Sequence, residues 1–153
     1  MASYRLHAKI ISRSTGRTAT AAAAYRSGTE IDCEVYGERH DYTNRGGVVH
    51  AEILTPENTP AWMSDRQALW NAVEKAERRK DAQLAREIQL SLPHELNADQ
   101  RRELVRDFVQ REYVDKGMIA DIAIHKPHAK GDQRNHHAHV MLTMRTLTKS
   151  GFG

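Results

Sequence analysis

The sequence lacks the features that mark secreted, membrane-embedded and repetitive proteins. It has one cysteine, Cys33, which cannot form an internal disulfide and fits a reducing cytoplasm. No stretch is long and apolar enough for a transmembrane helix, and residues 1–17 lack the apolar core of a signal peptide. There is no internal repeat and no low-complexity segment. We therefore expect a cytoplasmic protein.

Length and composition indicate one ordinary globular domain. The 153 residues are 39% hydrophobic and 28% charged, which suffices for one core and is short for two. There are 23 Lys and Arg against 20 Asp and Glu, so the charge permits a nucleic-acid partner without requiring one. The chain stops after TLTKSGFG without a closing element. We expect residues 1–153 to be a single domain from the N-terminal part of a longer protein.

Periodicity and capping residues predict the secondary structure. Strands are expected at 3–11, in segments of 30–54, and at 84–93, 118–125 and 136–144. Helices are expected from Thr18 to Gly28, from a capping box at Ser64–Gln67 to Arg79 or Lys80, and from Asn97 to Lys116–Gly117. The last two strands form a hairpin, and there are more strands than a parallel chain would need. The pattern predicts an α+β fold, with a mostly antiparallel central sheet of about five strands and helices packed on one side.

The stretch NHHAHVMLTM, residues 135–144, carries the clearest chemical signal. On a strand, His137 and His139 project from the same face with Cα atoms about 6.5–7 Å apart, so both imidazoles can bind one ion. His125 ends the preceding strand, and a hairpin would bring it beside His137. Three neutral imidazoles that leave coordination positions open are typical of a catalytic metal site. His128, in the connection between the strands, is the alternative third ligand.

A second informative stretch is TATAAAAYRSG, residues 18–28. Ala21 and Ala22 lie on the same face of the expected helix as Tyr25. Such small residues let a helix approach its neighbour closely, with the tyrosine projecting from it. Composition alone favours Tyr25 as a core aromatic.

Four segments together resemble a known family. AAAAYR, LAREIQLSLP, DIAIH and NHHAHVMLTMR, in this order, are similar to the relaxase domain of the MobA/MobL family, and most of all to TraA-type conjugative relaxases. The resemblance extends from Tyr4 to Arg145. These relaxases belong to the HUH class of endonucleases, named for two histidines that flank a hydrophobic residue, here Ala138. The resemblance implies an HUH relaxase-like fold in a bacterial protein.

The resemblance also implies an activity, namely site- and strand-specific nicking of plasmid DNA at an origin of transfer during conjugation. Tyr25 would attack the scissile phosphodiester and form a 5′-phosphotyrosine link. A divalent metal ion held by His125, His137 and His139 would orient the phosphate. Mn²⁺ or Mg²⁺ is expected, and Zn²⁺, Co²⁺ or Ni²⁺ also suits imidazole ligands. The implied partners are single-stranded plasmid DNA at the origin, other relaxosome proteins and a type IV secretion coupling protein.

Other residues are candidates for supporting roles. Glu87, on the polar face of its strand, can hydrogen-bond a ligand imidazole or accept the tyrosine proton, and Asp121 is a weaker candidate. Basic residues near the proposed nucleophile are expected to form a rim that binds DNA phosphates: Arg5, Lys9, Arg13, Arg17 and Arg26. Aromatic residues that can stack on unpaired bases are Tyr4, Tyr36, Tyr42 and Trp62.

Two alternatives remain at this point. An HUH replication initiator or transposase would use the same metal and tyrosine, but its nucleophile usually follows the H-x-H motif, whereas Tyr25 precedes it. A non-catalytic DNA-binding domain with a structural metal site would normally need four protein ligands with cysteine among them. Cys33 has no second cysteine to serve with it.

Overall fold

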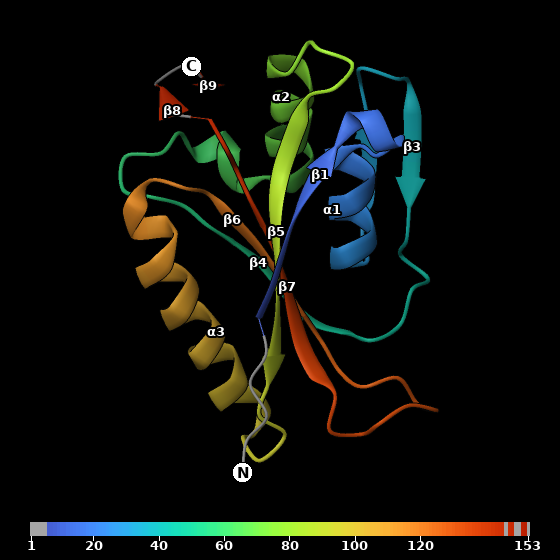
Figure 1. Cartoon of the computed structure of the whole chain (residues 1–153), viewed down its shortest axis with the longest axis vertical. Coiled ribbons are helices and arrows are strands. Elements are labelled where there is room, and N and C mark those ends of the chain that lie inside the picture. The colour runs from blue at the N-terminus through green and yellow to red at the C-terminus, as the bar shows by residue number, and fades with distance from the viewer. Residues whose placement is uncertain (1–5, 146, 149–150, 153) are drawn as a thin grey trace.

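A five-stranded antiparallel sheet forms the centre of the molecule, in the order β1-β5-β7-β6-β4 (Figure 1). The computed structural model describes residues 6–145, 147–148 and 151–152. The sheet strands are β1 (Leu6–Ser12), β4 (Val48–Leu54), β5 (Gln83–Leu92), β6 (Ala120–His125) and β7 (His136–Leu142). Two small hairpins pair β2 (Glu30–Cys33) with β3 (Glu38–Asp41), and β8 (Leu147–Thr148) with β9 (Gly151–Phe152).

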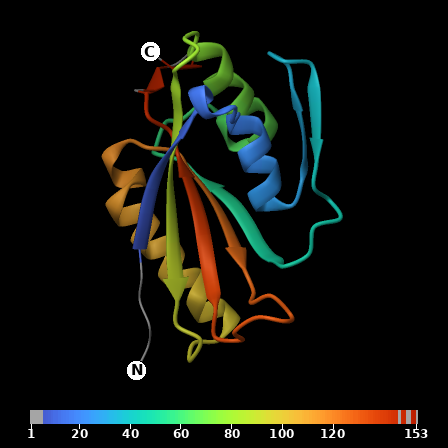
Figure 2. The ribbon, with the colours of Figure 1, turned by 45° about the vertical axis from the view of Figure 1, so that its right-hand side comes forward.

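The helices lie on both faces of this sheet (Figures 1 and 2). They are α1 (Ala19–Ser27), α2 (Arg66–Ala76) and α3 (Ala98–Glu112), with short 3₁₀ turns η1 (Arg13–Thr15), η2 (Ala61–Ser64) and η3 (Val114–Lys116). α3 packs on the face that carries Val140, whereas α1 and α2 share a core with Met141. The predicted α+β fold around five antiparallel strands is confirmed. The helices divide between the two faces rather than gathering on one, because Val140 and Met141, successive residues of β7, offer a buried apolar side chain to each face.

Two helix starts follow directly from the sequence. The side chain of Thr18 accepts a hydrogen bond from the Ala21 amide, and Gly28 ends α1 with a left-handed φ of 67°. Asn97 and Gln100 form the reciprocal capping box that opens α3. The sequence predicts these boundaries, because a helix cap is formed by residues only three positions apart in the chain.

The boundaries of α2 differ from the prediction. Ser64 lies in η2, and the cap is Asp65, whose carboxylate accepts from the Ala68 amide at 2.9 Å. α2 ends at Ala76, short of the predicted end. The side chain of Arg13 donates to backbone carbonyls at this end of α2, including that of Glu77 at 2.6 Å. A tertiary contact therefore satisfies carbonyls that the sequence pattern assigned to a longer helix.

The sheet order brings the candidate site residues together. β7 is the middle strand, with β5 on one side and β6 on the other. His139 lies opposite Gln89 of β5 and opposite Ala123 of β6, while His137 lies opposite His125. Within the described part of the chain, no helix has the length and apolar character needed to cross a membrane.

Candidate active site

Three histidines meet at one end of the β6–β7 hairpin. His125 and His137 are cross-strand partners, and His139 follows on the same face of β7. Their ring centroids lie 4.9 to 5.2 Å apart. One nitrogen of each ring lies within 4.8 Å of the other two. Metal-bound imidazole nitrogens lie about 2.0–2.1 Å from the ion, so small side-chain rotations would bring all three onto one ion.

Backbone carbonyls orient two of these imidazoles. Nε2 of His125 donates to the carbonyl of Arg26 at 2.7 Å, and Nδ1 of His137 donates to the carbonyl of Asn135 at 3.1 Å. A carbonyl oxygen only accepts, so it keeps the ring proton on the nitrogen that faces it. The other nitrogen of each ring then keeps its lone pair for a metal ion.

Burial keeps the imidazoles in the neutral form that a metal requires. It lowers the pKa of His125 to about 4, against the opposing effect of the Arg26 carbonyl and with the help of nearby positive charges. Burial likewise lowers the pKa of His137. At neutral pH these two rings are therefore unprotonated and able to coordinate.

The structure brings His125, and not His128, into this group. His128 lies exposed in the connection between β6 and β7, where its Nδ1 accepts from the Lys130 amide at 3.2 Å. The group of three found among the described residues consists of His125, His137 and His139.

Glu87 is a buried carboxylate beside His139, with only 1% of its surface exposed. It lies on β5, 3.7 Å from Nδ1 of His139 and 3.5 Å from Nζ of Lys9, and it contacts Nε of Arg26. Burial would raise the pKa of Glu87, but His139 and Arg26 outweigh it and lower the pKa to about 2. Such a carboxylate is a weak base. Glu87 is therefore suited to orienting His139 and poorly suited to accepting the tyrosine proton.

Asp121, the weaker candidate, is engaged elsewhere. Its carboxylate accepts from Nε and Nη2 of Arg66 at 2.8 and 2.9 Å and from Nε1 of Trp70 at 2.9 Å. Both donors belong to α2. Asp121 therefore joins α2 to β6, while the histidines lie further along the hairpin.

Tyr25 projects from α1 towards solvent on the face of the sheet that carries the histidines. It is 44% exposed, whereas the alanines before it, Ala22, Ala23 and Ala24, are buried. Its ring makes an edge contact with Tyr42, with centroids 5.2 Å apart, and the Cζ of Arg45 lies 4.1 Å from the ring centre. The residue after Tyr25 supplies the carbonyl that binds His125, so the end of α1 lies against the metal-ligand candidates.

The predicted basic rim is only partly assembled. Lys9 and Arg26 meet at Glu87, as described above. Arg13 is directed away from the site, with its guanidinium bound to the Glu74 carboxylate at 2.7 Å and to the end of α2. Arg17 is half-buried in the turn before α1, and Arg5 lies outside the described residues.

The aromatic candidates are also dispersed. Tyr42 contacts Tyr25, whereas Tyr36 and Trp62 are exposed on other elements, and Tyr4 lies outside the described residues. Arg45 was not predicted as a site residue. In the sequence, Arg45 is distinguished only by the two glycines that follow it. Its approach to Tyr25 depends on tertiary packing, so no local pattern predicts it.

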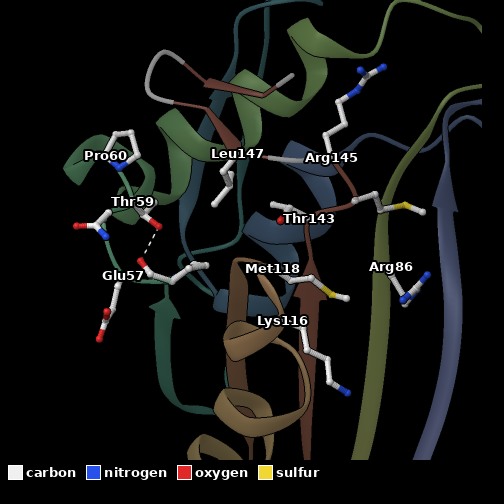
Figure 3. A pocket seen from close by; sticks show the side chains of 13 residues that line it. Glu57, Thr59, Pro60, Arg86, Lys116, Met118, Thr143, Arg145 and Leu147 are labelled. Carbon is white, nitrogen blue, oxygen red and sulfur yellow. Dashed lines mark hydrogen bonds between the residues drawn. The ribbon is translucent and has the colours of Figure 1, made fainter.

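A cavity of the molecule lies away from this site. It has a volume of about 700 Å³, and Figure 3 shows Arg86, Lys116, Met118 and Thr143 around it. Met118 precedes β6 and Thr143 follows β7, so the cavity lies at the opposite end of these strands from His125 and His137. This cavity therefore does not coincide with the candidate site.

Comparison with known proteins identifies the family to which this chain is similar. The model of the MobA/MobL family matches residues 17–153. "Conjugal transfer protein TraA" of Agrobacterium fabrum (strain C58) is 39% identical over 163 aligned positions, which cover 100% of this chain and 14% of that protein. "Mobilization protein MobL" of Acidithiobacillus ferridurans is 48% identical, over 87% of this chain and 34% of that protein. The chain thus spans about a third or less of the length of these relatives.

The fold agrees with the sequence match. A solved structure described as "Molecular Basis of Vancomycin Resistance Transfer in Staphylococcus aureus" superposes with a TM-score of 0.90 and 36% identity, covering 99% of this chain and 75% of that one. The predicted resemblance is confirmed: this chain belongs to the MobA/MobL family.

Proposed function

We propose that this chain is the relaxase domain of a conjugation or mobilization protein and nicks one DNA strand at an origin of transfer. The observation that carries the proposal is the group of His125, His137 and His139 beside the end of α1, where Tyr25 is exposed. Relatives named for conjugal transfer, mobilization and relaxation support the same process.

Tyr25 would act as the nucleophile. Its phenolic oxygen forms a bond to the scissile phosphorus while the bond from phosphorus to the 3′ oxygen breaks. The phenolic proton leaves to solvent, and the released 3′ oxygen takes up a proton, so no oxidant or further reactant is needed. The product is a 5′-phosphotyrosine ester with a free 3′-OH. This ester is close in energy to the phosphodiester, so the same residues can rejoin the strand.

The donor set fits a divalent ion. Three imidazole nitrogens suit Mn²⁺, Zn²⁺, Co²⁺ and Ni²⁺ better than Mg²⁺. An ion held by His125, His137 and His139 would stabilise negative charge on the phosphate oxygens. Glu87 would keep the proton of His139 on Nδ1, so that Nε2 faces the ion.

Positive charge at the site would serve the DNA backbone. Lys9 is 53% exposed while its ammonium group reaches Glu87, so the same group can face a phosphate from solvent. Arg26 is mostly buried against Glu87 and holds the end of α1. We include in the proposal single-stranded DNA as substrate, a bacterial cytoplasmic location, and relaxosome and type IV secretion partners.

A covalent-adduct assay tests the proposal. The protein would be incubated with Mn²⁺ and labelled single-stranded oligonucleotides that tile the transfer origin of the element encoding it. We expect a denaturation-resistant protein–DNA adduct that Tyr25→Phe abolishes. Tyr36→Phe is the matched control, since Tyr25 and Tyr36 are 44% and 45% exposed.

Other results would lead to different conclusions. DNA binding without any adduct from the unmodified protein would favour a non-catalytic DNA-binding domain. An adduct that survives Tyr25→Phe would assign the nucleophile to another residue. Adducts formed only with replication-origin or transposon-end oligonucleotides would favour the initiator or transposase class.

A further inference from the structure

Arg45 is carried by a loop whose path is fixed by the backbone. The loop joins β3 to β4. The Tyr42 amide donates to the Thr29 carbonyl at 3.1 Å, and the Arg45 amide donates to the Tyr42 carbonyl at 3.0 Å. At the far end of the loop, the Lys126 amide donates to the Gly47 carbonyl at 2.9 Å. These bonds attach the loop both to the end of α1 and to the end of β6.

The end of α1 also packs tightly on this loop. Gly28 has a φ of +67°, and a Cβ atom there would lie 3.2 Å from Cγ2 of Val48 and 3.8 Å from the carbonyl oxygen of Arg45. A side chain at residue 28 would therefore be strained, and it would crowd the Val48 side chain at the start of β4. The packing of α1 and the loop therefore fixes the position of Arg45 relative to Tyr25.

The guanidinium of Arg45 has unused hydrogen-bonding capacity. Its Cζ lies 4.1 Å from the centre of the Tyr25 ring, a cation–π contact that uses the face of the guanidinium and not its N–H donors. Nη1 is buried and has no hydrogen-bond partner within the described ranges. A buried donor without a partner is unfavourable, so the guanidinium would gain from turning towards a ligand that accepts hydrogen bonds.

The other partly buried arginines on this face are already neutralised. Arg26 contacts Glu87, Arg66 binds Asp121, and Arg13 binds Glu74. No carboxylate contacts Arg45 in the part of the chain that the structure describes. The loop that carries Arg45 ends beside the histidines, since the Gly47 carbonyl accepts from the Lys126 amide at 2.9 Å and Val48 pairs with His125. Arg45 is therefore close both to the proposed nucleophile and to the proposed metal ligands.

We propose that Arg45 is a catalytic residue that binds the scissile phosphate next to Tyr25, an inference that rests on the proposed nicking function. Its planar guanidinium donates two parallel hydrogen bonds to nonbridging phosphate oxygens. In phosphoryl transfer, negative charge is spread over these oxygens in the transition state. Because the guanidinium stacks on the Tyr25 ring, the same contact holds phosphorus within reach of the phenolic oxygen.

The test compares Arg45→Ala and Arg45→Lys with Arg39→Ala. Arg39 is the matched control because it is exposed on the neighbouring β3 and pairs with Glu30 and Asp32. One readout is the rate of adduct formation at saturating origin oligonucleotide with Mn²⁺. The other is the salt dependence of single-stranded oligonucleotide binding, measured in EDTA. Melting temperatures establish that each variant is folded, and Arg45→Lys keeps the test valid if the alanine variant is unstable.

We expect Arg45→Ala to slow adduct formation by about 10²–10³-fold, the effect of removing one preorganised donor to a developing oxyanion. Arg45→Lys should recover part of the rate, because it keeps the charge and loses the planar fork. The slope of log affinity against log salt should fall by about 0.7 for the one lost phosphate contact. Arg39→Ala should change neither readout.

The two proposals fail in different ways. A normal rate in Arg45→Ala overturns the role of Arg45, and so does a slow rate with an unchanged salt slope, because Arg45 would then act through Tyr25 alone. If the unmodified protein forms no adduct, the nicking function fails, and the salt slope alone then decides whether Arg45 binds a phosphate.

Discussion

Replacing Glu87 with glutamine should strongly destabilise the folded protein without changing its fold. Glu87 is 1% exposed and is the shared partner of Lys9, Arg26 and His139. The amide of glutamine has nearly the same volume but carries no charge. The mostly buried Arg26, 12% exposed, would then lose its counter-charge.

The size of the effect can be worked out in two ways. The pKa of Glu87 is lowered from 4.5 to about 2, and at about 1.4 kcal/mol per unit this corresponds to about 3 kcal/mol of folding free energy. Breaking a buried ion pair by removing one partner costs about 3–5 kcal/mol. The two estimates agree. Lys9 adds little, because its exposed ammonium is screened by solvent.

The sign of the pH dependence follows from the lowered pKa. The unfolded chain binds a proton at Glu87 near pH 4.5, while the folded chain resists until about pH 2. The stabilisation is therefore complete above pH 4.5 and is lost as the pH falls towards 2. The difference in stability between the wild type and Glu87→Gln should shrink across that range.

Urea denaturation in EDTA, followed by circular dichroism, measures this difference. At pH 7 the midpoint of Glu87→Gln should fall by about 1–3 M, using typical urea slopes. Glu112→Gln is the control, because Glu112 is an exposed partner of Lys116, and its midpoint should hardly move. If Glu87→Gln unfolds at the same urea concentration as the wild type, Glu87 is not the ionised centre of this network.

Two further predictions concern the metal ligands and the placement of α1. Mn²⁺ at about 100 times its dissociation constant should raise the melting temperature by about 5–10 °C. His137→Ala should abolish this gain and His128→Ala should keep it; the reverse result would restore His128 as a ligand. Glu74 is 1% exposed, accepts from the Ala19 amide at 2.6 Å and binds Arg13. Glu74→Gln should therefore lower the free energy of unfolding, measured by urea denaturation, by about 2–4 kcal/mol, and it should slow adduct formation. If the free energy of unfolding and the rate of adduct formation are both unchanged, this contact does not hold α1 in place.

Much of the metal site could be predicted from the sequence because it is built from local relationships. Alternation along a strand places His137 and His139 on one face. A hairpin connects consecutive strands, so His125 was expected opposite His137, and the register confirms it. The caps of α1 and α3 also depend on residues three positions apart, and both formed where expected.

Relationships across the chain could not be predicted in this way. The contact of the Arg26 carbonyl with His125 joins residues 99 positions apart, and no periodicity encodes it. The sequence alone favoured Tyr25 as a core residue, whereas the packing of the neighbouring alanines leaves its ring exposed.

Tertiary structure also determined which groups the charged residues contact. Arg13 and Arg45 are equally polar in the sequence, yet one is bound to the end of α2 and the other stacks on Tyr25. Glu87 became a buried carboxylate because β7 inserts between β5 and β6, which brings His139 over it. Local sequence determines which face a side chain takes, but only the packing of distant elements determines which groups meet there and which charges are already neutralised.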